Sequence, residues 1–212
     1  MSSAMSDPFH FSALEIAHLH ERATALWHRN EDPHHIHGHD FLDTVLNQHR
    51  ANFDLWHTED RARDPRASDR DMAEVKRTID RYNQRRNDLA EQCDVQLLNH
   101  ASDWLRPQGV PPATAQLHSE SPGLIIDRLS ILALKIFHTQ EEVDRPHAPA
   151  GHSDRNRQRL ATLTEQRDDL VACLDQLWAD VLAGRRRFKI YRQLKMYNDP
   201  TLNPSIYGTP PS

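Results

Sequence analysis

Hydrophobic residues recur every three or four positions along most of this chain, the spacing that places them on one face of an α-helix. Five segments carry this pattern, and stretches rich in proline or polar residues separate them. Glycine is scarce, with 6 residues, and charged residues make up 27% of the chain, as is typical of long helices with solvated outer faces. We therefore predict an all-α fold, a single-domain bundle of about five main helices within residues 1–212.

Capping residues and a proline set the boundaries of the first three helices. The first begins at Ser12, where a capping box with Glu15 satisfies two backbone amides that have no partner within the helix. The second covers about residues 41–63 and ends before Pro65, because the residue before a proline avoids the helical conformation. The third begins near Ser68 and is long.

A proline-rich linker, residues 107–119, separates these helices from the next two. The fourth helix begins at Ser121, which is suited to capping, and Pro122 suits the first helical position. This helix is apolar almost all round, which predicts a central, buried position. Residues 144–153 are interpreted as a loop, and the fifth helix covers about residues 154–183.

The segment after the fifth helix, residues 185–212, is basic and aromatic. Phe188 and Tyr191 are three residues apart, so we predict that residues 188–197 form a short helix or turn with its apolar side on the bundle. We therefore expect an ordered tail packed back on the helices. Residues 1–11 are predicted to be disordered.

Charge and cysteine content narrow the functional classes. The 26 basic and 31 acidic residues give a net charge of −5, which disfavours binding to nucleic acid or to an anionic membrane. No apolar run approaches the roughly 20 residues that a membrane-spanning helix needs, so we expect no membrane insertion. Cys93 and Cys173 each lie in a helical pattern, where we expect core packing rather than a disulfide, and we predict a cytoplasmic location.

Four stretches of the sequence together resemble a bacterial protein family. In order, they are LWHTEDRARD, VKRTIDRYNQRRNDLAEQCD, SESPGLIIDRLSILALKIFH and YRQLKMYNDPTLNP, and the similarity covers roughly residues 9–207. The family is one of unknown function, whose genes lie among glycosyltransferase genes in lipopolysaccharide and other surface-polysaccharide clusters. The resemblance implies activated-sugar chemistry on the cytoplasmic side, with a nucleotide sugar as ligand or a glycosyltransferase as partner. It implies no catalytic residue and no cofactor.

The densest group of potential metal ligands is the stretch DPHHIHGHD, which contains His34, His35, His37 and His39. Imidazoles at this density bind zinc or nickel in some proteins. The stretch also contains proline and glycine, and no helix or strand fixes the geometry of its side chains. We therefore interpret it as a solvated loop.

A second group of candidate metal ligands lies on the second and third helices. His57 and Asp60 are three residues apart and share a helix face, and the third helix carries a polar stripe at three- and four-residue spacing. Carboxylate and amide oxygens suit hard cations, so Mg²⁺ or Mn²⁺ is the candidate cofactor. A solvated helix face explains the same stripe and is the alternative. The candidate metal ligands are His57, Glu59, Asp60, Asp80, Asn83, Asn87 and Asp88.

Charged residues also stand in hydrophobic surroundings. Arg86 interrupts the apolar seam of the third helix, and Asp127 and Arg128 lie on the apolar fourth helix. Because an unpaired buried charge costs several kcal/mol, each of them needs a partner. A salt bridge between Arg86 and Asp127 is one explanation, and contacts with a phosphorylated ligand are the other.

Two further segments are candidates for binding phosphate. Ser119, Ser121 and Gly123 stand at the start of the fourth helix, where free backbone amides and the helix dipole favour anions, although capping by Ser121 accounts for the same pattern. The tail supplies side chains that either close one end of a polar cavity or cap the bundle. These are Tyr191, Arg192, Lys195, Asn198 and Asp199.

These patterns and the resemblance lead to two functional hypotheses. The first is metal-assisted binding or processing of a phosphorylated or nucleotide-activated sugar in cell-surface polysaccharide biosynthesis. The alternative is a non-catalytic helical partner or scaffold protein of a glycosyltransferase. RNA binding rests on the basic tail alone and has the least support. The apolar fourth helix is compatible with burial within one chain or in a homodimer.

Overall fold

The computed structural model describes residues 12–33, 40–109, 115–192 and 200–202. In this part of the chain the body consists of five α-helices: α1 (Ala13–His28), α2 (Asp40–Arg61), α3 (Asp69–Leu105), α4 (Pro122–Val143) and α5 (His152–Leu182). The short elements are the 3₁₀ turns η2 (Arg106–Gln108) and η5 (Pro200–Leu202) and the strands β1 (Gln116–Leu117) and β2 (Arg186–Arg187). The predicted all-α bundle of about five helices is confirmed.

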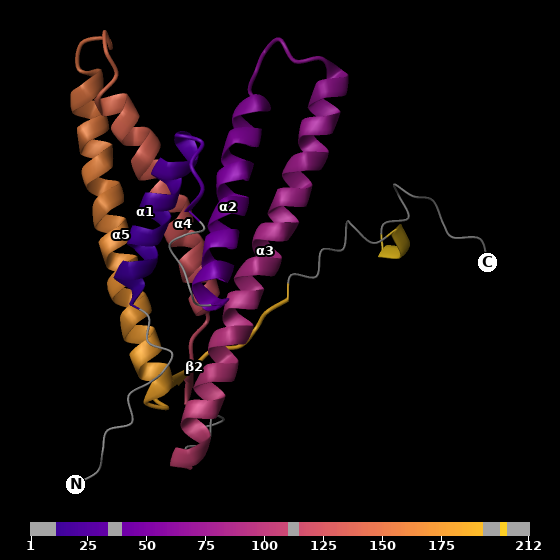
Figure 1. Ribbon diagram of the computed structural model, residues 1–212, viewed down its shortest axis with the longest axis vertical. Helices are drawn as coiled ribbons and strands as arrows, with labels where there is room; N and C mark the ends of the chain where they lie inside the picture. Colours follow the sequence, from indigo (N-terminus) through magenta and orange to yellow (C-terminus); the bar gives the residue numbers. More distant parts are fainter. Residues whose placement is uncertain (1–11, 34–39, 110–114, 193–199, 203–212) are drawn as a thin grey trace.

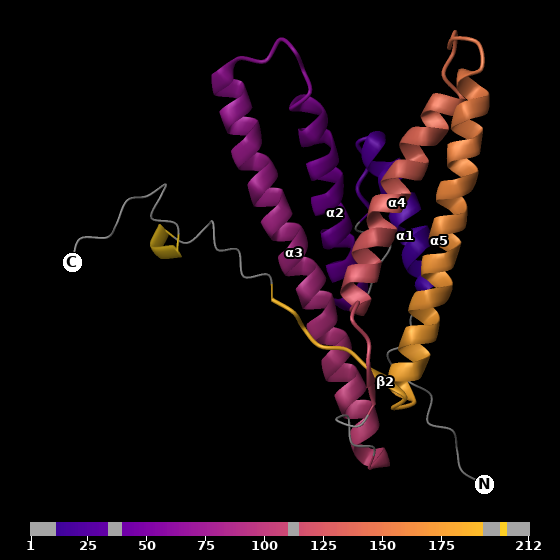
Figure 2. The same cartoon turned by 180° about the vertical axis from the view of Figure 1, so that it is seen from behind.

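The helices form two long antiparallel hairpins, with α2 beside α3 and α4 beside α5 (Figure 1). The shorter α1 packs against α4 and also contacts α2 and α5. The view from behind shows the segment after α5 crossing the outer side of α3 (Figure 2). In this arrangement α4 contacts each of the other four helices.

The helix boundaries follow the capping chemistry. Ser12 with Glu15 and Ser68 with Asp71 form capping boxes at the starts of α1 and α3. Gly151 precedes α5 with a φ of 72°, a backbone conformation that favours glycine. The helix begins directly after it at His152, two residues before the predicted start at 154.

The core is built around α4, as the sequence predicted. Ile125, Ile126, Leu129 and Leu134 are at most 2% exposed, and the first three belong to one apolar cluster with side chains of the other helices. The expected core position of the cysteines is right for Cys93, which is buried, and wrong for Cys173, which is exposed. The face of α5 that meets the bundle carries Leu170, Leu174 and Leu177, and position 173 is turned away from it.

The tail packs back on the bundle, but not as a helix. Strand β2 pairs in parallel with β1 in the linker before α4, and Gln116 lies opposite Arg186. Phe188 follows with 3% exposure and joins the core, whereas Tyr191 is 59% exposed. The predicted short helix or turn is wrong for residues 188–192, which are extended because β2 directs the chain across α3. Residues 193–199 lie outside the described part.

None of the described helices combines the length and the apolar composition needed to cross a membrane.

Candidate metal centre

Three histidines from three helices converge near one end of the bundle. His28 is the last residue of α1, and His57 and His138 lie in the C-terminal parts of α2 and α4. These helices run in the same direction, so their C-terminal ends lie toward the same end of the molecule (Figure 1). One ring nitrogen of each histidine lies within 4.8 Å of the other two. We call these three residues the histidine triad.

Hydrogen bonds fix two of the three imidazoles in the form that a metal requires. Nδ1 of His28 is 2.8 Å from the carbonyl oxygen of Thr24, and Nδ1 of His138 is 2.8 Å from a carboxylate oxygen of Glu141. Both oxygens accept, so Nδ1 carries a proton, and in the neutral ring Nε2 then carries the lone pair. Metal-bound histidines are held in this way by a carbonyl or a carboxylate on the far nitrogen.

The three Nε2 atoms are buried and have no hydrogen-bond partner among the described residues. An unsatisfied buried acceptor costs about 1–3 kcal/mol. Packing of aromatic rings accounts for the ring planes, since His28 stacks on Phe137 and His138 stacks on Trp56. It does not account for the convergence of three buried nitrogens, which a bound cation would satisfy together.

The electrostatic surroundings also suit a cation. Burial, followed by the neighbouring His28 and His138, lowers the pKa of His57, so its imidazole is neutral and available as a ligand near pH 7. His28 stands at the C-terminal end of α1, where the partial negative charge of the helix favours positive charge.

The histidine triad offers three imidazoles, and no fourth protein ligand joins them among the described residues. Catalytic zinc sites have this kind of donor set, and a water or a substrate fills the fourth position. Zinc–nitrogen distances of about 2.0–2.1 Å place tetrahedral ligand atoms about 3.3 Å apart. The histidine triad therefore fits such an ion after a modest inward movement of its rings.

A separate groove brings together many of the residues predicted from the sequence to bind a ligand. It has a volume of about 230 Å³ and lies between α3, the start of α4 and the tail segment that crosses them. Arg192 of the tail pairs with Glu91 of α3 at 3.3 Å. The predicted residues that line the groove are Arg86, Asn87, Asp88, Ser121, Asp127, Tyr191 and Arg192.

The buried end of this groove is a salt bridge with further polar partners. Nε of Arg86 is 3.2 Å from a carboxylate oxygen of Asp127 and forms an ion pair with it without a hydrogen bond. Asp127 also accepts hydrogen bonds from Asn52 at 2.9 Å and from Gln48. Burial raises the pKa of Asp127, and Arg86 and the two amides oppose that rise. Of the two explanations for Arg86, the salt bridge is the one that the contacts show.

The polar network continues from there to α1. Ser130 receives a hydrogen bond from Asn52 at 2.8 Å and lies 2.8 Å from Nδ1 of His49. Nε2 of His49 is 2.9 Å from the hydroxyl of Thr24 and 3.0 Å from the carbonyl of His20. Burial lowers the pKa of His49 to about 3 and that of His20 well below its ordinary value, so both rings are neutral.

The start of α4 is already occupied by a carboxylate. Asp94 of α3 accepts a hydrogen bond from the hydroxyl of Ser121 at 2.5 Å and from the backbone amide of Gly123 at 2.6 Å. The predicted capping by the Ser121 side chain is therefore wrong, since that hydroxyl donates to Asp94. A side chain at position 123 would collide with the carbonyl oxygen of Ala90, so only glycine permits this close contact between α3 and α4. Ser119 is exposed and does not line the groove.

The candidate oxygen ligands for Mg²⁺ or Mn²⁺ do not form one constellation with His57. Glu59 and Asp60 lie within 3.7 Å and 3.0 Å of Arg63. Asp88 accepts a hydrogen bond from Gln84 at 2.7 Å. Asp80 and Asn83 do not line the groove, and they are not part of the cluster formed by the histidine triad.

The remaining predicted residues lie on the surface or outside the described part of the chain. Arg128 donates two hydrogen bonds to Glu120 at 2.9 and 3.1 Å, on the surface of the bundle. Lys195, Asn198 and Asp199 lie outside the described residues, as do the four histidines of the stretch at 34–39.

Sequence reasoning identified His57 but missed its two partners. His28 and His138 are 29 and 81 residues away, so no local spacing connects the three. The buried amides Gln48 and Asn52 were missed as well, although they are four residues apart on α2 and next to apolar positions, which is a detectable signal.

Comparison with known proteins leads to a family without an assigned activity. A search of curated proteins gives no match, and a search of solved structures gives none either. Residues 42–190, well over half of the chain, match the family described as "Protein of unknown function (DUF4254)", and the chain belongs to that family.

Proposed function

We propose that this protein holds a divalent transition-metal ion in the histidine triad and uses it in the binding or processing of a phosphorylated or nucleotide-activated sugar. One observation carries the metal site: three histidines from three helices each bring a ring nitrogen within 4.8 Å of the other two, and the Nε2 atom of each is buried and has no hydrogen-bond partner among the described residues. The proposal includes His57 from the predicted ligand set and replaces its oxygen partners with His28 and His138.

The donor type selects among ions. Imidazole nitrogen suits Zn²⁺ and related transition metals, whereas Mg²⁺ and Mn²⁺ prefer carboxylate and carbonyl oxygen. Zn²⁺ is therefore the ion expected in the histidine triad, in place of the Mg²⁺ or Mn²⁺ suggested by the sequence. Such an ion, when bound, polarises a phosphoryl oxygen or lowers the pKa of a bound water.

The chain's own residues supply the frame for that ion. The Thr24 carbonyl and the Glu141 carboxylate hold the Nδ1 protons of His28 and His138, which keeps both Nε2 atoms free for the metal. Phe137 and Trp56 fix the planes of the same two rings. A site held this way loses little order when the ion binds.

The biological setting is also a proposal. The resemblance of the four quoted stretches supports a role in cell-surface polysaccharide biosynthesis in the cytoplasm, where nucleotide sugars are the phosphorylated ligands. The alternative, a non-catalytic partner of a glycosyltransferase, would use the basic segment after α5 as its binding surface. Arg185 and Arg186 pair with Asp180, and Arg187 donates to the Ala115 carbonyl, so much of that charge is used within the chain.

Metal content provides the test. We expect about one zinc ion per chain, retained through gel filtration, in the wild type and in His18→Ala, an exposed position on α1. His57→Ala and His138→Ala should lose it while their circular dichroism stays helical. A variant with serine at 34, 35, 37 and 39 controls for the histidine-rich stretch. Zinc that is absent from the wild type, or unchanged in His57→Ala, would refute the site.

A further inference from the structure

A large pocket lies next to the histidine triad, between α4 and α5. Its volume is about 760 Å³, within the range of small-molecule binding sites. Trp56 and His138 line one side, and polar side chains of α5 line the other. The pocket therefore shares one wall, His138, with the proposed metal centre.

Three of the side chains that line the pocket carry uncompensated positive charge. Lys135 comes from α4, and Arg155 and Arg159 come from successive turns of α5. Within the described residues, none of these three forms a salt bridge. The Arg159 guanidinium donates a hydrogen bond to a neutral group, the amide oxygen of Asn156, at 3.2 Å.

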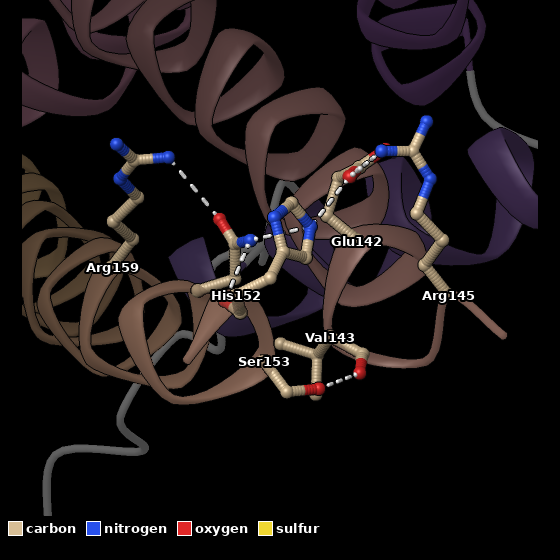
Figure 3. Close-up of polar contacts among 7 residues, drawn as sticks. Glu142, Val143, Arg145, His152, Ser153 and Arg159 are labelled. Atoms are coloured by element: carbon tan, nitrogen blue, oxygen red, sulfur yellow. Dashed lines mark hydrogen bonds and ion pairs between the residues drawn. The ribbon is translucent and has the colours of Figure 1, made fainter. Parts of the chain in front are cut away.

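The acidic residue at the rim, Glu142, has its own partners (Figure 3). Its carboxylate is 3.1 Å from Arg145 and 2.8 Å from Nε2 of His152. The hydroxyl of Ser153 donates to the Val143 carbonyl at 2.5 Å and ties the start of α5 to the end of α4. The carboxylate of Glu142 is therefore partly neutralised within the hairpin. It does not balance the positive charge of Lys135, Arg155 and Arg159, which line the same pocket.

One wall suits a flat ring. Trp56 stacks on His138 with the rings 7° from parallel and their centroids 5.0 Å apart. Leu163 adds apolar surface on α5, and the mostly buried Asn156 contributes a polar side chain to the lining. A ligand with an anionic end and a planar end would meet complementary groups at both ends.

We infer that this pocket binds a nucleoside diphosphate group, with Lys135, Arg155 and Arg159 contacting the phosphates and Trp56 contacting the base. The inference rests on the proposed function, because it names the ligand class that the neighbouring metal would assist. Arginine suits this role, since its planar guanidinium contacts phosphate oxygens in pairs. The volume accommodates one nucleotide-sized molecule and the net charge of −5 disfavours a nucleic-acid strand.

Calorimetric titration of the zinc-loaded protein with UDP and, separately, with inorganic pyrophosphate tests the inference. We expect saturable binding of both probes, and tighter binding of UDP. Arg155→Glu combined with Arg159→Glu should weaken both by at least tenfold. Arg157→Glu is the matched control, because Arg157 lies between them on α5 but pairs with Asp154 and does not line the pocket. Trp56→Leu should weaken the binding of UDP more than it weakens the binding of pyrophosphate.

The outcomes separate this inference from the proposed function. Zinc binding without saturable UDP or pyrophosphate binding would refute the pocket and leave the metal centre intact. Equal affinity in the double variant and the wild type would refute the assignment of the arginines. If His57→Ala loses zinc but binds UDP as the wild type does, the pocket stands and metal assistance of binding is refuted. Binding of UDP no tighter than that of pyrophosphate would refute the role of Trp56.

Discussion

The carboxylate of Glu141 accepts a hydrogen bond from Nδ1 of His138 at 2.8 Å, three residues along α4. This contact leaves Nε2 of His138 as the nitrogen available to a metal. Glu141 itself does not belong to the histidine triad.

Glu141→Gln tests this relationship. The variant keeps a hydrogen-bond acceptor but loses the charge, so we expect zinc affinity to fall about tenfold, at the lower end of the effect of such outer contacts. Competition with a chromophoric chelator measures the change. Asp144→Asn, an exposed position at the end of α4, should leave the affinity unchanged. An unchanged affinity in Glu141→Gln would show that the contact does not orient His138.

Asp127→Asn should destabilise the fold. The variant retains the size of the side chain but leaves Arg86, whose side chain is 26% exposed, without its counter-charge. Breaking a mostly buried pair costs about 3 kcal/mol, which urea unfolding would detect. Glu120→Gln removes the partner of exposed Arg128 and should cost less than about 1 kcal/mol. Similar losses in the two variants would contradict the assigned burial.

Asp94 gives the fold a specific dependence on pH. Burial raises its pKa from 3.8 to about 6, against the opposing hydrogen bonds from Ser121 and Gly123. A carboxyl whose pKa is higher in the folded state stabilises the fold while it is protonated. This contribution is complete below about pH 4 and is lost as the pH rises through 6.

Asp94→Asn isolates that contribution, because asparagine stays neutral at every pH. Between pH 4 and 7 the stability of the variant should rise relative to the wild type by about 2 kcal/mol. His49 acts in the opposite direction in both proteins, since its lowered pKa makes protonation below pH 6.5 destabilising. Urea unfolding across this range measures the difference, and parallel curves for the two proteins would rule out a raised pKa at Asp94.

Phe188 anchors the tail, and its removal should loosen it. Phe188→Ala deletes a side chain that is 3% exposed and should cost about 3 kcal/mol of unfolding free energy. Tyr191→Ala, three residues further and 59% exposed, should change it by less than about 0.5 kcal/mol. Thermal unfolding of both variants compares them, and equal midpoints would mean that the tail does not support the bundle.

The sequence predicts the helices of this protein better than its polar contacts. Period, capping residues and prolines locate all five α-helices because these signals act over one or two turns. The pairing of Arg86 with Asp127 was also accessible, since a buried charge requires a partner. By contrast, the contact of Asp94 with Ser121 depends on how α3 and α4 approach each other, which no local pattern specifies.

The histidine triad illustrates the same limit. His57 was a candidate because of its neighbours on α2, but its partners arise only when α1, α2 and α4 are aligned at their C-terminal ends. His138 lies at the end of a stretch that looks apolar, and His28 lies at the end of a helix where a basic residue is common. Each position looks unremarkable alone, and the site exists only in three dimensions.

The pairing of β1 with β2 closes the α4–α5 hairpin at its base. The amide of His118 donates to the Arg187 carbonyl at 2.8 Å, and that of Gln116 donates to the Arg185 carbonyl at 3.2 Å, so residues 116–187 form a loop fastened without a covalent bond. Because each strand depends on the other for these hydrogen bonds, opening one releases both. We therefore expect the amide hydrogens of the two strands to exchange with solvent together.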